Sequence, residues 1–345
     1  MKYAHPVFYW LCILVFFSCG DDKEMEPDET YVFKEPANFP PSTYTFDNNP
    51  VTKEGFELGR KLFFDPLLSK DGSVSCNNCH IQGTTFADSQ QHPLSVGVDN
   101  RLGIRNAPPL TNLAFMQEFF WDGGVTHLDF VPINAIEAEF ELGETLENVV
   151  KKLNEDEEYP DLFQDAFGID KVTSPYMLQA LSQFMVMMVS ANSKYDKYVR
   201  QEGETLTGEE LQGLELFDAK CSSCHSGALF SDFSYRNNGL NDTFIDEGRA
   251  RISEFDGDVG KFRVPSLRNI ALTSPYMHNA RFKTLKDVLD HYDEGMVDSP
   301  TLDPLFKTGA RLGIELSEDE KGKIIAFLRT LTDRDFTSDE RFMNP

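Results

Sequence analysis

Two short motifs of the form Cys-x-x-Cys-His, at residues 76–80 and 221–225, hold four of the six cysteines of the chain. This pattern is the attachment signature of c-type haem. Two thiols one turn apart can add to the two vinyl groups of a haem, and the histidine that follows can present its imidazole to the iron. The thiols would be those of Cys76, Cys79, Cys221 and Cys224, and the proximal iron ligands His80 and His225.

Other interpretations of paired cysteines explain the motifs less well. A zinc ribbon has its two Cys-x-x-Cys pairs about 15–20 residues apart, whereas 141 residues separate Cys79 from Cys221. A disulfide or a redox dithiol gives no reason for a histidine directly after both pairs. The sequence therefore predicts two covalently bound haem c groups.

The sequence around the motifs is repeated. Residues 108–114 and 265–271 share the pattern Pro-x-Leu-x-Asn-aliphatic-Ala, 157 positions apart, and the same spacing pairs Trp121 with His278. The haem motifs are 145 positions apart, so we expect the second copy to carry about a dozen extra residues in a polar surface loop between residues 237 and 260. The chain therefore resembles two copies of one haem-binding module.

The elements that must position these motifs are predicted to be helices. A segment from Thr173 to about Arg200 begins with a capping residue and a proline and carries apolar residues at helical spacing. Its methionines are expected to fill the core rather than to ligate haem. Shorter helices are expected at residues 53–64, 146–154, 208–218, 285–291 and 317–331, and no alternating strand pattern is seen. The predicted fold is mainly α, with two cytochrome c-like haem domains related by internal duplication at residues 51–190 and 191–335, followed by a tail at 336–345.

The N-terminus has the features of an export signal. Residues 1–18 contain Lys2 and an apolar stretch that ends just before Cys19, which is typical of a signal peptide. Cys19 lies where a bacterial lipoprotein is lipidated, and Cys12 would be removed with the signal. Residues 19–50 are acidic and proline-rich, so we expect a tether between a lipid anchor and the folded body. The expected location is the periplasm at the outer membrane, with display at the cell surface as the alternative.

The composition limits the partners. The chain has 32 Lys and Arg against 57 Asp and Glu, a formal charge of −25. A strongly acidic chain is poorly suited to nucleic acid, whose recognition requires cations at the phosphates. A basic soluble partner fits better. Beyond residue 20 no apolar run reaches the ~20 residues of a membrane span, so membrane contact is expected only through the anchor.

The motifs together resemble those of the bacterial di-haem cytochrome c peroxidases. The resemblance rests on the two haem motifs, on Arg-Asn-Ala-Pro at 105–108, on Phe-Trp-Asp-Gly at 120–123 and on Leu-Thr-Ser-Pro-Tyr-Met-His at 272–278. It extends from about Phe56 to about Thr330, and the family also includes the methylamine-utilisation di-haem enzyme, which oxidises tryptophans of a protein substrate. The resemblance implies that hydrogen peroxide reacts at the N-terminal haem. Electrons would enter at the C-terminal haem from a basic cytochrome c or cupredoxin, and the protein would form a homodimer.

The resemblance also implies roles for residues outside the haem motifs. Trp121 matches a tryptophan that carries electrons between the two haems, although an ordinary buried aromatic residue is the alternative. Asn106, Thr273 and Pro275 match residues around a calcium ion between the domains, and amide and carbonyl oxygens suit that hard cation.

The acid that breaks the O–O bond of peroxide is expected to be Glu141. A carboxylate beside the open haem face can move a proton from one peroxide oxygen to the other. Glu137 and Glu139 are the competing candidates, and each of the three could instead be a solvated surface charge. A glutamine often found nearby in the family is replaced by Val131.

Two positions depart from the peroxidase pattern. The histidine that caps the resting N-terminal haem in many relatives is replaced by Val98, which cannot ligate iron, and His92 on the same loop is a weaker substitute. This haem is therefore expected to be five-coordinate. At the C-terminal haem Tyr292 is the expected sixth ligand, with Met296 and His291 as alternatives. A phenolate ligand stabilises ferric iron and lowers the reduction potential.

The sequence therefore predicts a peroxidase that reduces hydrogen peroxide to water. A di-haem electron carrier without peroxide chemistry is the main alternative, but a carrier is expected to keep both irons six-coordinate. Oxidation of a partner protein or an organic substrate is a second alternative, which the tyrosine ligand favours.

Overall fold

The structure is a computed structural model that describes residues 1–3, 29–88, 94–309 and 311–345. Most regular elements in these ranges are helices, as predicted. The longer ones are α1 (Lys53–Phe64), α2 (Val131–Glu137), α3 (Leu146–Glu155), α4 (Tyr159–Phe167), α5 (Ser174–Val186), α6 (Lys194–Val199), α7 (Gly208–Lys220), α9 (Leu285–Asp290) and α10 (Glu318–Arg329). The shorter ones are α8 (Ala250–Ser253) and α11 (Arg334–Thr337). Two small antiparallel sheets, which we did not predict, pair β1 (Tyr235–Arg236) with β2 (Phe262–Arg263), and β3 (Lys307–Thr308) with β4 (Arg311–Leu312).

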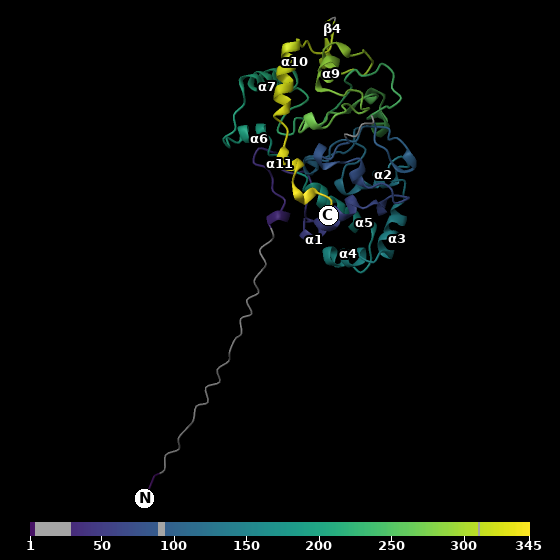
Figure 1. Cartoon of the computed structure of the whole chain (residues 1–345), viewed down its shortest axis with the longest axis vertical. Coiled ribbons are helices and arrows are strands. Elements are labelled where there is room, and N and C mark those ends of the chain that lie inside the picture. Colours follow the sequence, from purple (N-terminus) through teal and green to yellow (C-terminus); the bar gives the residue numbers. More distant parts are fainter. Residues whose placement is uncertain (4–28, 89–93, 310) are drawn as a thin grey trace.

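The helices form two bodies, each built on a close crossing of two helices. In Figure 1, α1 to α5 lie in the lower body, and α6, α7, α9 and α10 in the upper one. α1 crosses α5 at Gly59, where a Cβ atom would lie 1.9 Å from the carbonyl oxygen of Ala180. α7 crosses α10 at Gly213, where a Cβ atom would lie 2.0 Å from the carbonyl oxygen of Lys323. Only glycine allows such approaches, and the likeness of the two crossings supports the predicted duplication.

A second likeness lies at the junction between the bodies. Asn112 and Asn269, which occupy equivalent positions of the sequence repeat, both adopt positive φ angles of about 60° and each precedes a single 3-10 turn. Both amides reach Ser190: Asn112 Nδ2 donates to its carbonyl oxygen at 3.1 Å and Asn269 Nδ2 donates to its Oγ at 2.8 Å. The two repeats therefore meet at one buried serine.

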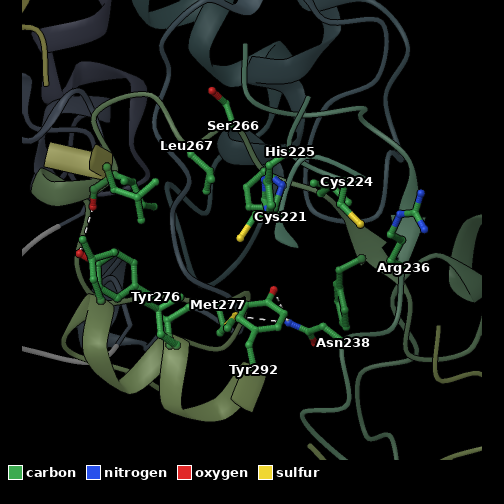
Figure 2. A pocket seen from close by; sticks show the side chains of 18 of the residues that line it. Cys221, Cys224, His225, Arg236, Asn238, Ser266, Leu267, Tyr276, Met277 and Tyr292 are labelled. Atoms are coloured by element: carbon green, nitrogen blue, oxygen red, sulfur yellow. Dashed lines mark hydrogen bonds between the residues drawn. The ribbon is translucent and has the colours of Figure 1, made fainter. Parts of the chain in front are cut away.

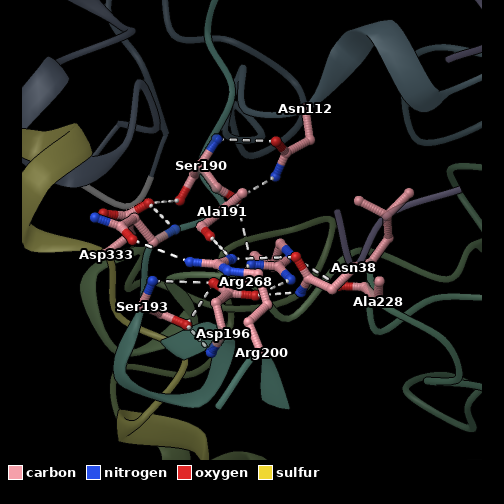
Figure 3. Close-up of polar contacts among 12 residues, drawn as sticks. Asn38, Asn112, Ser190, Ala191, Ser193, Asp196, Arg200, Ala228, Arg268 and Asp333 are labelled. Atoms are coloured by element: carbon pink, nitrogen blue, oxygen red, sulfur yellow. Dashed lines mark hydrogen bonds and ion pairs between the residues drawn. The ribbon is translucent and has the colours of Figure 1, made fainter. Parts of the chain in front are cut away.

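A buried ion pair joins the same region (Figure 3). Arg268 Nη1 and Nη2 donate to the two carboxylate oxygens of Asp196 at 2.9 and 2.7 Å, and both side chains are at most 1% exposed. Asn38 Nδ2 donates to the same carboxylate at 2.9 Å, and the Arg268 guanidinium lies 4.3 Å from the ring centre of Phe39. The pair therefore connects the N-terminal segment to the second body.

The helix predicted from Thr173 to Arg200 is interrupted, so the segment forms two helices. α5 ends at Val186 and α6 begins at Lys194. Between them the amide of Ser190 donates to Asn112 Oδ1 and that of Asn192 donates to Asp333 Oδ2. Side chains from distant parts of the chain thus take the place of the helical hydrogen bonds.

Parts of the predicted tether and of the predicted tail pack into the first body, which was not expected. Within the predicted tether, Tyr44 and Asn49 are buried, and residues 29–50 line the first core. Within the predicted tail, Phe342 is buried against Phe56 and Phe184. The earlier part of the tether, residues 4–18 of the signal segment and Cys19 lie outside the described residues, as does His92. No helix in the described ranges is long and apolar enough to cross a membrane.

Candidate haem sites

The two motif histidines are held in the same way. His80 Nδ1 lies 2.7 Å from the carbonyl oxygen of Phe86, and His225 Nδ1 lies 3.1 Å from that of Phe230. An Nδ1–H that donates to a carbonyl leaves Nε2 as the free lone pair for a metal. Desolvation by burial lowers the pKa of both imidazoles and favours the neutral form that binds iron. Both rings are therefore prepared as axial ligands.

The four motif thiols are unpaired and protonated. All four are free cysteines, and burial raises the pKa of Cys76 and Cys221 to about 12 and that of Cys79 to about 11. Such thiols are poor redox nucleophiles. In the described ranges no three His, Cys, Asp or Glu side chains are grouped to hold a metal ion. The redox-dithiol and zinc interpretations therefore lack support, and the residues fit covalent haem.

A largely apolar cavity lies beside the second motif (Figure 2). It has a volume of about 280 Å³. The Cys221 and Cys224 thiols and the His225 ring lie on one side, and the Tyr292 ring faces them across the open space. Most of the remaining lining is hydrophobic, including Phe262, Val264, Leu289, Ile314 and Leu328. A flat apolar group with a histidine on one face and a tyrosine on the other fits this arrangement.

Tyr292 is held in place by a π-helical turn, His291–Gly295, that follows α9. Such turns are frequent at functional sites. The next residue, Asp293, forms an ion pair with Lys321 of α10 at 3.0 Å, and the Lys321 side chain is 7% exposed. The Tyr292 carbonyl accepts from the amide of Ile314 at 2.7 Å. Burial raises the pKa of the Tyr292 phenol, so the hydroxyl is protonated at neutral pH.

The alternatives to Tyr292 do not line the cavity. Met296 is buried in a separate cluster with Leu302 and Phe306, and His291 Nε2 lies 2.9 Å from the carbonyl oxygen of Asn238. Two lining residues were missed by the sequence analysis. Asn238 Nδ2 donates to Tyr292 Oη at 3.5 Å and to Met277 Sδ at 3.4 Å. Met277 belongs to the Leu-Thr-Ser-Pro-Tyr-Met-His motif, which could have drawn attention to it.

Glu141 lies near the first motif. Its carbonyl oxygen accepts from the amide of Val98 at 2.9 Å, and its negative charge contributes to the raised pKa of Cys76 and Cys79. Glu141 is exposed. Neighbouring protein nevertheless desolvates its carboxyl enough to raise the pKa to about 7.

The competing acids are exposed, as Glu141 is, but they differ from it in their contacts. Glu139 is exposed and pairs with Arg101 at 2.7 Å, and Glu137 is exposed on α2. Neither contributes to the pKa shifts of the motif thiols. Val131, where a glutamine was looked for, begins α2 and is partly buried.

The loop after the first motif carries the apolar residue Val98 at the position where the family resemblance placed a haem-capping histidine. Val98 is 1% exposed and belongs to the first hydrophobic core. On the same loop the Ser95 side chain hydrogen-bonds to Cys79 and donates to Asp88 Oδ2 at 2.6 Å. The loop therefore lies against the first haem motif. Its residue 98 is a valine, whereas many relatives have a histidine there.

Trp121 lies at the junction of the two bodies. Its Nε1 donates to the carbonyl oxygen of Asn106 at 2.8 Å, and its ring lies edge-on to His278 with 6.4 Å between centres. The indole also lines the second cavity. The His278 ring stacks on Phe262 at 3.6 Å, and burial lowers its pKa to about 4.

The residues proposed for calcium meet at this junction. Asn106 Nδ2 donates to the carbonyl oxygens of Pro275 at 2.6 Å and Met277 at 3.2 Å. Thr273 Oγ1 instead donates to the carbonyl oxygen of Ile270 at 3.3 Å. Two carbonyl oxygens thus converge on the NH2 group of Asn106, and Thr273 does not join them.

Comparison with known proteins gives a consistent picture. Residues 53–204 match the family model of the di-haem cytochrome c peroxidases. The chain is 33% identical over 288 residues to the methylamine utilization protein MauG of Methylorubrum extorquens, covering 82% of this chain and 79% of the relative. It is 33% identical over 293 residues to the cytochrome c551 peroxidase of Pseudomonas aeruginosa, covering 82% of this chain and 80% of the relative. A solved structure of a MauG-like protein associated with microbial copper homeostasis superposes with a TM-score of 0.81 at 31% identity, covering 91% of this chain and 99% of that one.

Proposed function

This chain belongs to the di-haem cytochrome c peroxidase family, and we propose that it reduces hydrogen peroxide to two waters with two electrons and two protons. The observation that carries the proposal is the placement of Glu141, a carboxyl with a pKa of about 7, beside the first haem motif. A group with a pKa near the working pH both accepts and returns a proton efficiently.

The chain's own residues supply binding and proton transfer. When bound, each haem supplies a redox-active iron, and the thiols and imidazoles of the two motifs would hold it. The Glu141 carboxylate takes a proton from one oxygen of peroxide and returns it to the oxygen that leaves. Val98 cannot ligate iron, so it would not compete with peroxide at the first haem.

Electrons reach the peroxide site from the second body. Trp121 bridges the junction, with its indole at the second cavity and its hydrogen bond to Asn106 in the first repeat. The donor is a small redox protein such as a basic cytochrome c or cupredoxin, because the chain carries a charge of −25. The protein forms a homodimer in this proposal.

Tyr292 supports a second candidate function, the oxidation of a partner protein or organic substrate. It is the candidate sixth ligand that lines the second cavity. A tyrosine ligand lowers the potential of its haem and makes oxidation beyond the ferric state easier. One of the similar proteins is named for methylamine utilization.

EPR spectroscopy of the purified ferric protein tests the main proposal. We expect one high-spin haem and one low-spin haem, and oxidation of a reduced cytochrome c when peroxide is added. Two low-spin haems and no donor oxidation would support an electron carrier instead. Turnover of an organic or protein substrate without any cytochrome oxidation would support the second candidate.

Replacing Tyr292 with methionine is expected to raise the potential of the C-terminal haem. Thioether stabilises ferrous iron where phenolate stabilises ferric iron, so a rise on the order of 0.1 V is expected within the ~0.8 V range that axial ligands control. Redox titration followed by absorbance measures the change. Met296→Leu is the matched control, since Met296 lies outside the cavity and its replacement should leave the potential unchanged. A fall in potential in Met296→Leu, with no rise in Tyr292→Met, would assign the ligand to Met296.

Calcium and the lipid anchor complete the proposal. A calcium ion would use oxygens around Asn106 and Pro275, and metal analysis of the purified protein checks its presence. Cys19 would carry the lipid after removal of residues 1–18, which places the enzyme in the periplasm at the outer membrane. Mass spectrometry of the mature N-terminus tests that assignment, because diacylglyceryl addition and cleavage before Cys19 have defined masses.

A further inference from the structure

The turn that carries Tyr292 packs closely against the segment that follows β4. Gly313 lies in this segment with a φ angle of 92°, and a Cβ atom there would lie 2.4 Å from the carbonyl oxygen of Tyr292 and 2.8 Å from that of Asp293. The amide of Ile314 donates to the same Tyr292 carbonyl oxygen. Only glycine fits such an approach, so the backbone of the turn has little room to move.

The Asp293 side chain adds charged contacts to this backbone contact. Its buried carboxylate pairs with Lys321 at 3.0 Å and with Arg311, and it accepts from the amide of Leu316 at 3.3 Å. Arg311 also donates to the Asp293 carbonyl oxygen at 3.0 Å. One carboxylate therefore connects the turn to β4, to α10 and to the segment between them.

Lys321 connects the turn to the helix that precedes it. Its ammonium group is buried and also pairs with Asp290, the last residue of α9, at 2.8 Å. Its third partner, Glu318 at 3.0 Å, is exposed on α10. Because Asp290 and Asp293 lie on either side of Tyr292 in the sequence, one lysine holds the chain both before and after the tyrosine.

The ion pair lies behind the cavity rather than in it. The Tyr292 ring lines the cavity and faces His225, whereas neither Asp293 nor Lys321 is among the lining residues. A buried ion pair is often no more stabilising than apolar side chains of the same size, so its value can lie in fixing one geometry. A metal site needs such support, because its ligands must be held within about 0.5 Å of the productive geometry.

We propose that Asp293 and Lys321 are positioning residues that hold the Tyr292 phenol where it can ligate the iron of the C-terminal haem. The inference rests on the haem attachment and the Tyr292 ligand proposed above, and it requires no peroxide chemistry. A hydrogen bond to a charged group is worth about tenfold or more in an equilibrium. Without the ion pair, a measurable fraction of the phenol should therefore leave the ligand position.

Absorbance and resonance Raman spectra of the ferric holoprotein test the proposal, with neither peroxide nor electron donor present. A tyrosine ligand gives a phenolate-to-iron charge-transfer band, and Tyr292→Phe identifies this band because it removes the phenol oxygen. Asp293→Ala removes the carboxylate, and Asp293→Asn keeps its shape but removes its charge. Glu318→Gln is the control, because it takes the same charge away from Lys321 at the surface and leaves the turn intact.

We expect Asp293→Ala to lower the ratio of tyrosine-ligated to unligated C-terminal haem by about tenfold or more. Asp293→Asn should lower this ratio less, and Glu318→Gln should leave it unchanged. The midpoint potential of the C-terminal haem should rise as the phenolate is lost.

A full band in Asp293→Ala with two haems bound would overturn the proposal, even if that variant unfolds more easily, because the ion pair would then be merely structural. An equal loss in Glu318→Gln would also overturn it. If Asp293→Ala is not recovered with two haems, Asp293→Asn decides: a weakened band supports the proposal and a full band contradicts it. An unchanged spectrum in Tyr292→Phe would remove the ligand and the positioning role together, whereas failure of the peroxidase reaction would affect neither.

Discussion

Replacement of Glu141 with glutamine is expected to lower kcat for peroxide reduction by roughly 10²- to 10⁴-fold, the usual contribution of a general acid or base. The amide has nearly the shape of the carboxyl but cannot take a proton from peroxide. Haem content, measured as the pyridine haemochrome, should stay at two per chain because Glu141 is not part of either attachment motif. Steady-state oxidation of a reduced cytochrome c measures the rate.

Glu139→Gln is the matched control for this variant. Glu139 is two residues away, exposed and paired with Arg101, so its removal should leave kcat near the original value. If the two variants lose activity equally, or if Glu141→Gln retains full activity, Glu141 has no part in proton transfer.

The pH dependence follows from the same group. The carboxylate form of Glu141 accepts the proton, and burial raises its pKa to about 7. Activity should therefore rise with pH through about 7 and fall as the carboxyl becomes protonated below it. The Glu141→Gln variant should lose this step in the pH profile, and a step of the same size in both proteins would assign it to another group.

Replacement of Asp196 with asparagine is expected to reduce the free energy of unfolding by about 3–5 kcal/mol, the range for breaking a buried ion pair by removing one partner. The change leaves Arg268 charged and buried at the junction of the two bodies. Denaturant unfolding of the holoprotein, followed by circular dichroism, measures the effect.

An exposed ion pair provides the comparison. Lys61 and Glu158 are 2.8 Å apart but 32% and 71% exposed, so Glu158→Gln should cost less than about 1 kcal/mol. A cost for Asp196→Asn as small as this would show that the junction does not depend on the buried pair.

Acid should weaken the same junction. Burial by itself would raise the pKa of Asp196, but the hydrogen bonds and charge of Arg268 outweigh it and hold the pKa below its ordinary value. A lowered pKa in the folded state adds stability above the unfolded value of about 4, and this stability is lost as pH falls through the folded value. The pair therefore stabilises the protein throughout the neutral range.

The sequence predicted the bounds of a helix correctly where contacts between neighbouring residues set those bounds. α1 has the predicted bounds Lys53–Phe64, and its start is set by Thr52, whose side chain accepts from the Gly55 amide at 3.0 Å. The helix predicted from Thr173 to Arg200 is broken between Val186 and Lys194. It stops because Asn112 and Asp333, far away in sequence, bind the amides that would have continued it.

The sequence by itself determined the haem attachment sites. Attachment depends on residues that are neighbours in the chain, so the two Cys-x-x-Cys-His motifs were enough to predict two haems. Only the tertiary structure decided which distant side chains share a site. It brought Tyr292 rather than Met296 to the second cavity and raised the pKa of Glu141 by desolvation. These properties depend on desolvation and on contacts between residues far apart in sequence, which no local pattern records.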